Sequence, residues 1–221
     1  MDGRIRVEHV EGARVVRLEE DANLFDDAFL AAFHSTLDTI EAETSGAPVV
    51  TVGSAKYFSN GFDLEYLGRL EGDELWDFVG RSCTLLARVL TFPAPTIAAI
   101  NGHAFGIGGM LGLAHDRRVM RHDRGWFCLP EVDLGLGFHP FMQALITARL
   151  APDTAAEATL TGRRYDGTAA LGAGIVHATA ADADLLPSAI AHMASWAGKQ
   201  APVLGALKAQ LYASITATLS R

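Results

Sequence analysis

The stretch of sequence best suited to chemistry is a glycine-rich segment between Pro95 and Asp116. An apolar run at residues 96–100 is followed by a turn with Gly106, Gly108 and Gly109, and then by more apolar residues. Glycines let another group approach the backbone closely. The first N–H groups of a helix are unpaired and lie at the positive end of its dipole, where a developing oxyanion is stabilised. We therefore expect half of an oxyanion hole in this turn.

Two further stretches complement it. Residues 58–64 form a glycine-containing loop after the apolar run 48–53, and residues 130–137 place Glu131 in an apolar, glycine-containing loop. Desolvation raises the pKa of a carboxyl group and makes it a stronger base. The neighbours expected to desolvate Glu131 are Phe127, Leu129, Val132 and Leu134.

The elements that must position these stretches alternate between strands and helices. Strand patterns occur at 4–10, 13–18, 48–53, 96–100, 117–120 and 125–128, and helical spacing occurs at 26–43 and 74–90. The pattern predicts irregular structure at residues 129–138. After residue 140 it predicts mostly helices, with an extended piece near 175–176. This alternation predicts an α/β fold with crossover connections.

Composition excludes several classes of function. The chain has 221 residues, 49% hydrophobic and 20% charged, with a net charge of −8, which argues against a nucleic-acid partner. We expect no membrane span and no secretory signal, and hence a cytoplasmic protein. Cys83 and Cys128 are expected to be reduced and buried. The histidines show no metal-ligand spacing, so no metal site is predicted.

Taken in order, the three stretches resemble the crotonase superfamily, the enoyl-CoA hydratase/isomerase group. Residues 58–64 match F-[SC]-[AN]-G-x-D-[LI], residues 95–108 match P-x-[IV]-A-[AV]-[IV]-N-G-x-A-x-G-x-G, and 130–135 match [PE]-E-x-x-[LI]-G. The similarity extends over roughly residues 5–200. It implies a crotonase (ClpP/crotonase-like) spiral of ββα units over 1–185. A helical segment, 186–221, would serve oligomerisation and cover the active site.

The resemblance also implies roles for individual residues. The backbone N–H of Phe62 would be one oxyanion donor, and that of Ile107 or of Gly108 the other. Glu131 would be the catalytic carboxylate. Met110 stands where hydratases of the family carry a second glutamate, and methionine cannot move a proton. The arrangement therefore resembles the single-glutamate Δ3,Δ2-enoyl-CoA isomerases of fatty-acid metabolism.

Two alternatives stay open at this stage. One is a hydratase, or another acyl-CoA thioester reaction, in which a different group activates the water. The candidates for that group are Asp133, His103 and His139. The other is a non-catalytic homologue that binds acyl-CoA and keeps only the fold.

The substrate contacts are likewise implied by resemblance. Coenzyme A would enter as the thioester substrate, with no separate cofactor, and the assembly would be a homotrimer or a hexamer. Its binding residues would be Lys56, Phe58, Ser59 and Asn60, the last three through backbone groups. The acyl pocket would include Phe62, Met110 and Leu134. Lys199 and Lys208 are further candidates for phosphate contacts.

Overall fold

A computed structural model describes residues 3–43, 46–196 and 198–220. Its large sheet has the strand order β1-β2-β3-β5-β7-β9. The strands are β1 (Ile5–Val10), β2 (Ala13–Leu18), β3 (Val49–Val52), β5 (Thr96–Ile100), β7 (Arg117–Arg121) and β9 (Ala178–Ala180). The β1–β2 hairpin is antiparallel and every later pairing is parallel, with Val50 opposite Ile97 in the central pair. The middle strands are buried on both faces, as parallel sheets require.

A second, smaller sheet is formed by short parallel strands in the order β4-β6-β8. These are β4 (Tyr57–Ser59), β6 (His103–Phe105) and β8 (Phe127–Cys128). Each directly follows a strand of the large sheet, so β3-β4, β5-β6 and β7-β8 are three repeats of one turn of a spiral.

One glycine marks the passage between the sheets in each repeat. A β-carbon on Gly53 would lie 2.1 Å from the carbonyl oxygen of Tyr57, and one on Gly102 would lie 2.0 Å from that of Lys56. A β-carbon on Gly125 would lie 2.3 Å from the carbonyl carbon of Gly102. No larger residue fits at these crossings, because backbone atoms of the same repeat (at Gly53) or of the neighbouring repeat (at Gly102 and Gly125) occupy the space.

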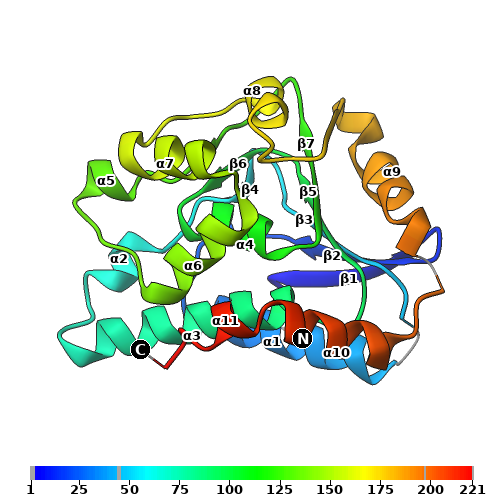
Figure 1. Cartoon of the computed structure of the whole chain (residues 1–221), viewed down its shortest axis with the longest axis horizontal. Helices are drawn as coiled ribbons and strands as arrows, with labels where there is room; N and C mark the ends of the chain where they lie inside the picture. The colour runs from blue at the N-terminus through cyan, green and yellow to red at the C-terminus, as the bar shows by residue number, and fades with distance from the viewer. Residues whose placement is uncertain (1–2, 44–45, 197, 221) are drawn as a thin grey trace.

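Helices cover both faces of the large sheet (Figure 1). They are α1 (Asp27–Ala42), α2 (Leu64–Leu67), α3 (Asp73–Leu90), α4 (Ile107–Ala114), α5 (Glu131–Leu134), α6 (Pro140–Arg149), α7 (Pro152–Thr161), α8 (Gly167–Gly172), α9 (Asp182–His192), α10 (Ala201–Leu211) and α11 (Ala213–Thr216), with a 3₁₀ turn at Ala194–Trp196. Leu185 and Ala189 of α9 pack on one face, and the main core lies on the other. No helix in these ranges is both long and apolar enough to cross a bilayer.

Helix α4 is buried along its whole length. All of its residues from Ile107 to Ala114 are buried, because it is apolar around its whole circumference. It contacts α3, α6 and β6, which fixes its direction. Its first turn therefore faces the small sheet and its last turn meets the start of β7.

Most of the predicted elements are confirmed, and so is the crotonase architecture. Three details differ. The sequence analysis missed β4 and β6, since strands of three residues carry no readable periodicity. The segment 129–138 contains the short helix α5, and the expected extended piece at 175–176 lies instead at Ala178–Ala180. Both cysteines are buried and free. The domain boundary after residue 185 stays a prediction, and α9 spans it.

Candidate active site

The small sheet brings the three stretches together. The loop with Phe62 follows β4, the glycine turn follows β6, and Glu131 follows β8. These strands are parallel neighbours with β6 in the middle, so their carboxyl ends lie at one edge. The glycine turn is therefore flanked by the first loop on one side and by Glu131 on the other.

The loop after β4 exposes one backbone donor. The amide of Phe25 donates to the Gly61 carbonyl (2.9 Å), and that of Asp63 donates to the Phe25 carbonyl (3.1 Å). In this parallel bridge the N–H of Phe62 points away from Phe25. It has no acceptor in the described part of the chain. Gly61 has φ +91° and lies against the Phe105 carbonyl, where a β-carbon would come within 2.9 Å.

The ring of Phe62 belongs to an aromatic cluster. It packs edge-on against Phe25 and tilted against Phe78, with ring centroids 6.2 and 5.7 Å away. The side chain is half-buried against the main core. Packing of the ring thus anchors the backbone that carries the free amide.

The first turn of α4 supplies further donors. Its first helical hydrogen bond runs from the amide of Met110 to the Gly106 carbonyl (3.0 Å). Among the described residues, nothing accepts from the amides of Ile107 and Gly108. The Ile107 nitrogen lies 3.9 Å from where a β-carbon on Gly61 would stand. Gly108 is packed against Ser59. Which of the two amides is the second donor stays a prediction.

Glu131 is the acid of this site. Its side chain is 9% exposed, and its Oε2 atom is buried without a hydrogen-bond partner in the described part of the chain. Its Oε1 atom lies 3.2 Å from where a β-carbon on Gly106 would stand. Burial raises the pKa of the Glu131 carboxyl to about 7, as the sequence analysis expected. The stated cause was partly wrong, because Val132 and Leu134 are about half exposed.

The predicted substrate contacts lie along β4 and differ in access. Lys56 is exposed, with its ammonium 5.7 Å from the ring centre of Tyr57. The side chains of Phe58 and Ser59 are buried, and the amide of Asn60 already donates to the Ala22 carbonyl (2.9 Å).

The two remaining predicted acyl-pocket residues differ in exposure. Leu134 is half exposed on α5. Met110 has no exposed surface and lies within the main core, and its place in an acyl pocket stays a prediction. The inference that the site lacks a second catalytic glutamate is unaffected, because position 110 carries no carboxylate.

Among the described residues, none of the groups offered as alternative water activators has a hydrogen bond or ion pair with Glu131. His139 caps α6, with Nδ1 accepting from the Phe141 amide (3.2 Å). His103 is at the start of β6 and stacks on Trp126, at the far end of the small sheet from Glu131. Asp133 lies against Gly162, at the end of α7.

Lys208 is also placed differently from its expected role. Its ammonium is buried and donates to a carboxylate oxygen of Asp116 (2.5 Å) and to the Ala94 carbonyl (2.8 Å). It therefore fastens α10 to the core and does not present a charge to a phosphate. Lys199 is exposed. Within the described ranges, no three His, Cys, Asp or Glu side chains gather as a metal site.

Two buried asparagines support the site and were not singled out from the sequence. Asn23 has a left-handed backbone, with φ +47°. Its side-chain Nδ2 donates to the Phe58 carbonyl (3.1 Å), and its backbone carbonyl accepts from Ser59 Oγ (2.7 Å). Asn101 accepts from the Gly53 amide (2.9 Å). Asparagine tolerates a left-handed backbone, and its side chain forms hydrogen bonds with nearby main-chain groups. These properties of asparagine could have indicated the two supporting residues from the sequence.

A two-sheet spiral with free backbone donors beside one buried carboxyl group defines an enzyme of the crotonase fold. The chain belongs to the enoyl-CoA hydratase/isomerase family, whose model matches residues 9–221. It is 37% identical over 168 residues to enoyl-CoA delta isomerase 3 of Arabidopsis thaliana, covering 74% of this chain and 71% of that one. It is 30% identical to a probable enoyl-CoA hydratase of Bacillus subtilis, covering 87% and 75%.

Solved structures agree with the fold. An enoyl-CoA hydratase/isomerase family protein from Pseudomonas syringae superposes with a TM-score of 0.90 at 23% identity, covering 98% of this chain and 94% of that chain. The enoyl-CoA hydratase of Bacillus anthracis gives a TM-score of 0.85 at 25% identity, covering 96% and 84%.

Proposed function

We propose that this protein is a Δ3,Δ2-enoyl-CoA isomerase with one acid–base group. The Glu131 carboxylate takes a proton from C2 of a 3-enoyl thioester, and the electrons of that C–H bond delocalise onto the thioester oxygen. The N–H groups of Phe62 and Ile107 stabilise this dienolate. Protonated Glu131 then gives the proton to C4, which leaves the double bond between C2 and C3.

The observation that carries the proposal is the partnerless, buried oxygen of Glu131 beside the glycine turn, with Met110 where a second acid would stand. A C–H next to a thioester is a weak acid, so the enolate needs stabilisation as it forms. Each preorganised donor contributes on the order of 3 kcal/mol to lowering such a barrier. Relatives named delta isomerases, at 37% identity, favour the same reaction.

The reaction as proposed needs no metal or redox cofactor, since the thioester itself carries the developing charge. Coenzyme A would lie along the start of the small sheet, with Lys56 near a phosphate and the backbone of 58–60 along the carrier. Phe62 and Leu134 would line the acyl chain.

A hydratase is the second candidate, because another relative is named a probable enoyl-CoA hydratase. Hydration needs a second group to position and activate water. The positions of His103, His139 and Asp133 offer none beside Glu131, and this favours the isomerase. A homologue that binds thioesters without turnover is the third candidate.

One experiment separates the three. Purified protein is given 3-hexenoyl-CoA and, separately, crotonyl-CoA, and products are resolved by chromatography. We expect conversion to 2-hexenoyl-CoA, little hydration, and a loss of about 100-fold or more in kcat for Glu131→Gln. The matched control, Asp133→Asn, should retain activity. Rapid hydration of crotonyl-CoA would establish the hydratase instead, and binding without turnover would establish the third candidate.

We further propose a homotrimer or hexamer in the cytoplasm. Exposed Val203, Leu207 and Leu211 give α10 an apolar face for such an assembly. Light scattering of the purified protein tests the assembly. Cell fractionation tests the compartment, which matters because two plant relatives are named peroxisomal.

A further inference from the structure

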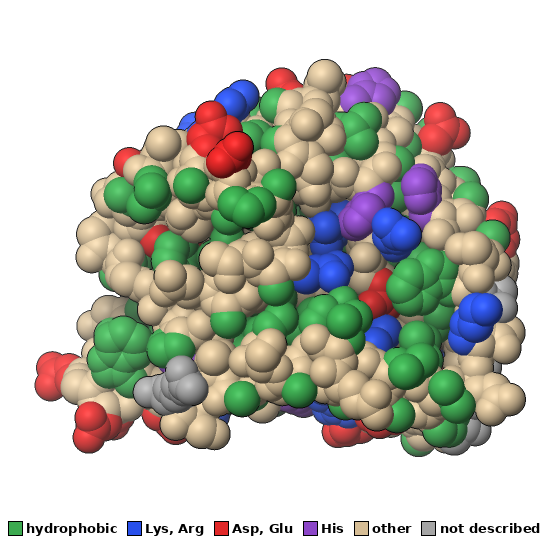
Figure 2. Space-filling model, viewed as in Figure 1, with side chains coloured by type: hydrophobic (Ala, Val, Ile, Leu, Met, Phe, Trp, Pro, Cys, Tyr) green, Lys and Arg blue, Asp and Glu red, His purple; other side chains and the backbone are tan. Residues whose placement is uncertain are grey.

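A second charged region lies at the opposite end of α4 from the backbone donors. It is a cavity of about 310 Å³ beside the start of β7, the end of α6 and the C-terminal segment. Its polar lining consists of Asp116, Arg117, Arg118, Arg149, His177 and Tyr212. Figure 2 shows basic and histidine side chains gathered in a hollow right of the centre of this face.

Within the described residues, the arginines of this cavity have no carboxylate as an ion-pair partner. Arg118 is buried, and its Nε donates to the Ile175 carbonyl (2.5 Å). Arg149 donates to the carbonyls of Leu113 (3.0 Å) and of His115 (2.7 Å), at the end of α4. In the described ranges, the Arg117 guanidinium has neither a hydrogen bond nor an ion pair, and no ion pair includes Arg118 or Arg149.

The one carboxylate in the lining is already neutralised. Asp116 accepts from the Lys208 ammonium (2.5 Å) and from the amide of Thr96 (2.8 Å). Three guanidinium charges are thus left over in a chain whose net charge is −8. Gathering like charges away from water is costly unless an anion joins them.

The titrating groups respond to this surplus. Burial and then Arg149 lower the pKa of the Arg118 guanidinium to about 9. Burial and then Arg118 lower the pKa of His177 to about 3, so its ring is neutral. Its Nδ1 accepts from the Arg118 amide (3.1 Å), which leaves the proton on Nε2 as a further donor.

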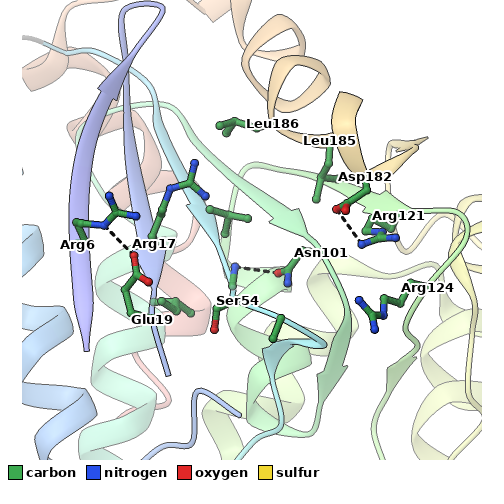
Figure 3. A pocket seen from close by; sticks show the side chains of 14 residues that line it. Arg6, Arg17, Glu19, Ser54, Asn101, Arg121, Arg124, Asp182, Leu185 and Leu186 are labelled. Atoms are coloured by element: carbon green, nitrogen blue, oxygen red, sulfur yellow. Dashed lines mark hydrogen bonds and ion pairs between the residues drawn. The ribbon is translucent and has the colours of Figure 1, made fainter. Parts of the chain in front are cut away.

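Another cavity, larger than this one, differs in its pairing of charges. It measures about 540 Å³ and lies where the strands of the large sheet end, beside α9 (Figure 3). Most of its arginines are paired with acids: Arg6 pairs with Glu19 (2.8 Å), and Arg121 pairs with Asp182 (2.8 Å). Arg17 pairs with Glu8 just outside (2.6 Å), and Arg124 has no ion pair in the described ranges. The cavity lined by Arg117, Arg118 and Arg149 therefore has more unpaired positive charge than the larger one.

We propose that the cavity between Arg117, Arg118 and Arg149 binds a phosphate group. The guanidinium of Arg117 can match phosphate oxygens in a forked geometry. Arg118 and Arg149 already donate to carbonyl groups, and they add the positive charge that favours a dianion over a single carboxylate. The phosphate is either free or carried on an organic molecule such as the nucleotide end of coenzyme A. Arg117 is its most accessible contact, because this side chain is half-exposed and bonds to nothing else in the described chain.

Titration calorimetry with inorganic phosphate tests the proposal without any assay of turnover, so its result is independent of the proposed isomerase activity. The variant is Arg117→Gln, which removes one charge and no internal hydrogen bond. The matched control is Arg124→Gln, which removes the same charge from the larger cavity. Thermal unfolding of each variant without phosphate verifies that it folds.

We expect phosphate to bind the wild type, Arg117→Gln to weaken it by about 10-fold or more, and Arg124→Gln to leave it unchanged. Displacement of phosphate by coenzyme A but not by dephospho-coenzyme A would assign the site to the 3′-phosphate of that molecule. No displacement would assign it to a separate anion. Absence of binding, or weakening by Arg124→Gln alone, overturns the proposal.

Discussion

The carboxyl group of Glu131 lies against the α-carbon of Gly106. Its Oε1 atom is 3.2 Å from where a β-carbon on that glycine would stand, and among the described residues no atom outside Gly106 and its two chain neighbours comes within 4 Å of that point. Gly106 has φ +52° and is the residue immediately before Ile107, whose amide is free. One backbone position thus sets both the direction of a donor and the room available to the base.

Gly106→Ala should reduce activity beyond its effect on stability. A methyl group would push the Glu131 carboxyl away by a few tenths of an ångström, and the rate of proton transfer depends steeply on the position of the base. Gly72→Ala is the matched control, because Gly72 also precedes a helix, has φ +54° and has an empty surrounding. Both variants should lose about 1–2 kcal/mol of stability. Equal kcat values for the two would contradict the proposed contact.

The pH dependence of turnover should report the carboxyl group of Glu131. Only its ionised form removes a proton, and burial raises its pKa to about 7. We therefore expect kcat/KM to rise with pH and to level off above about 7. Steady-state kinetics between pH 5 and 9 measures this. Asp133→Asn should leave the profile in place, whereas a midpoint near the ordinary value of 4.5 would mean that the site is hydrated.

The raised pKa of Glu131 also predicts that the ionised carboxylate, which the reaction needs, lowers the stability of the fold. The folded protein binds the Glu131 proton more tightly than the unfolded chain does, so the stability that this proton provides is complete below about pH 4.5. That stability is lost as pH rises to about 7. Glu131→Gln should raise the free energy of unfolding at pH 8 by up to about 3 kcal/mol over the wild type, and by little at pH 4.5. Denaturant unfolding at both pH values tests this, and an equal gain at both would rule the explanation out.

Lys208→Met should destabilise the fold without weakening substrate binding. It leaves the buried Asp116 carboxylate unpaired, which costs about 3–5 kcal/mol. Lys199→Met, at an exposed position, should change stability by less than about 0.5 kcal/mol. The double variant Lys208→Met with Asp116→Asn should recover part of the loss. A raised KM for enoyl-CoA in folded Lys208→Met would instead indicate that Lys208 contacts a phosphate of the substrate.

The sequence by itself determined the order of the elements and the candidate groups. Apolar periodicity is a local property, so the hairpin, α1, α3 and the parallel strands were readable. The roles of Phe62, Ile107 and Glu131 came from motif resemblance. The short strands β4 and β6, which hold these residues side by side, left no periodic trace.

Only the tertiary structure decided which groups meet and in what surroundings. Glu131 is buried although Val132 and Leu134 beside it are half exposed, because a side chain's solvation depends on what folds over it and not on its sequence neighbours. Lys208 became an internal partner of Asp116, 92 residues away along the chain. Such contacts and the free energies that follow from burial arise between distant segments, and no local pattern in the sequence records them.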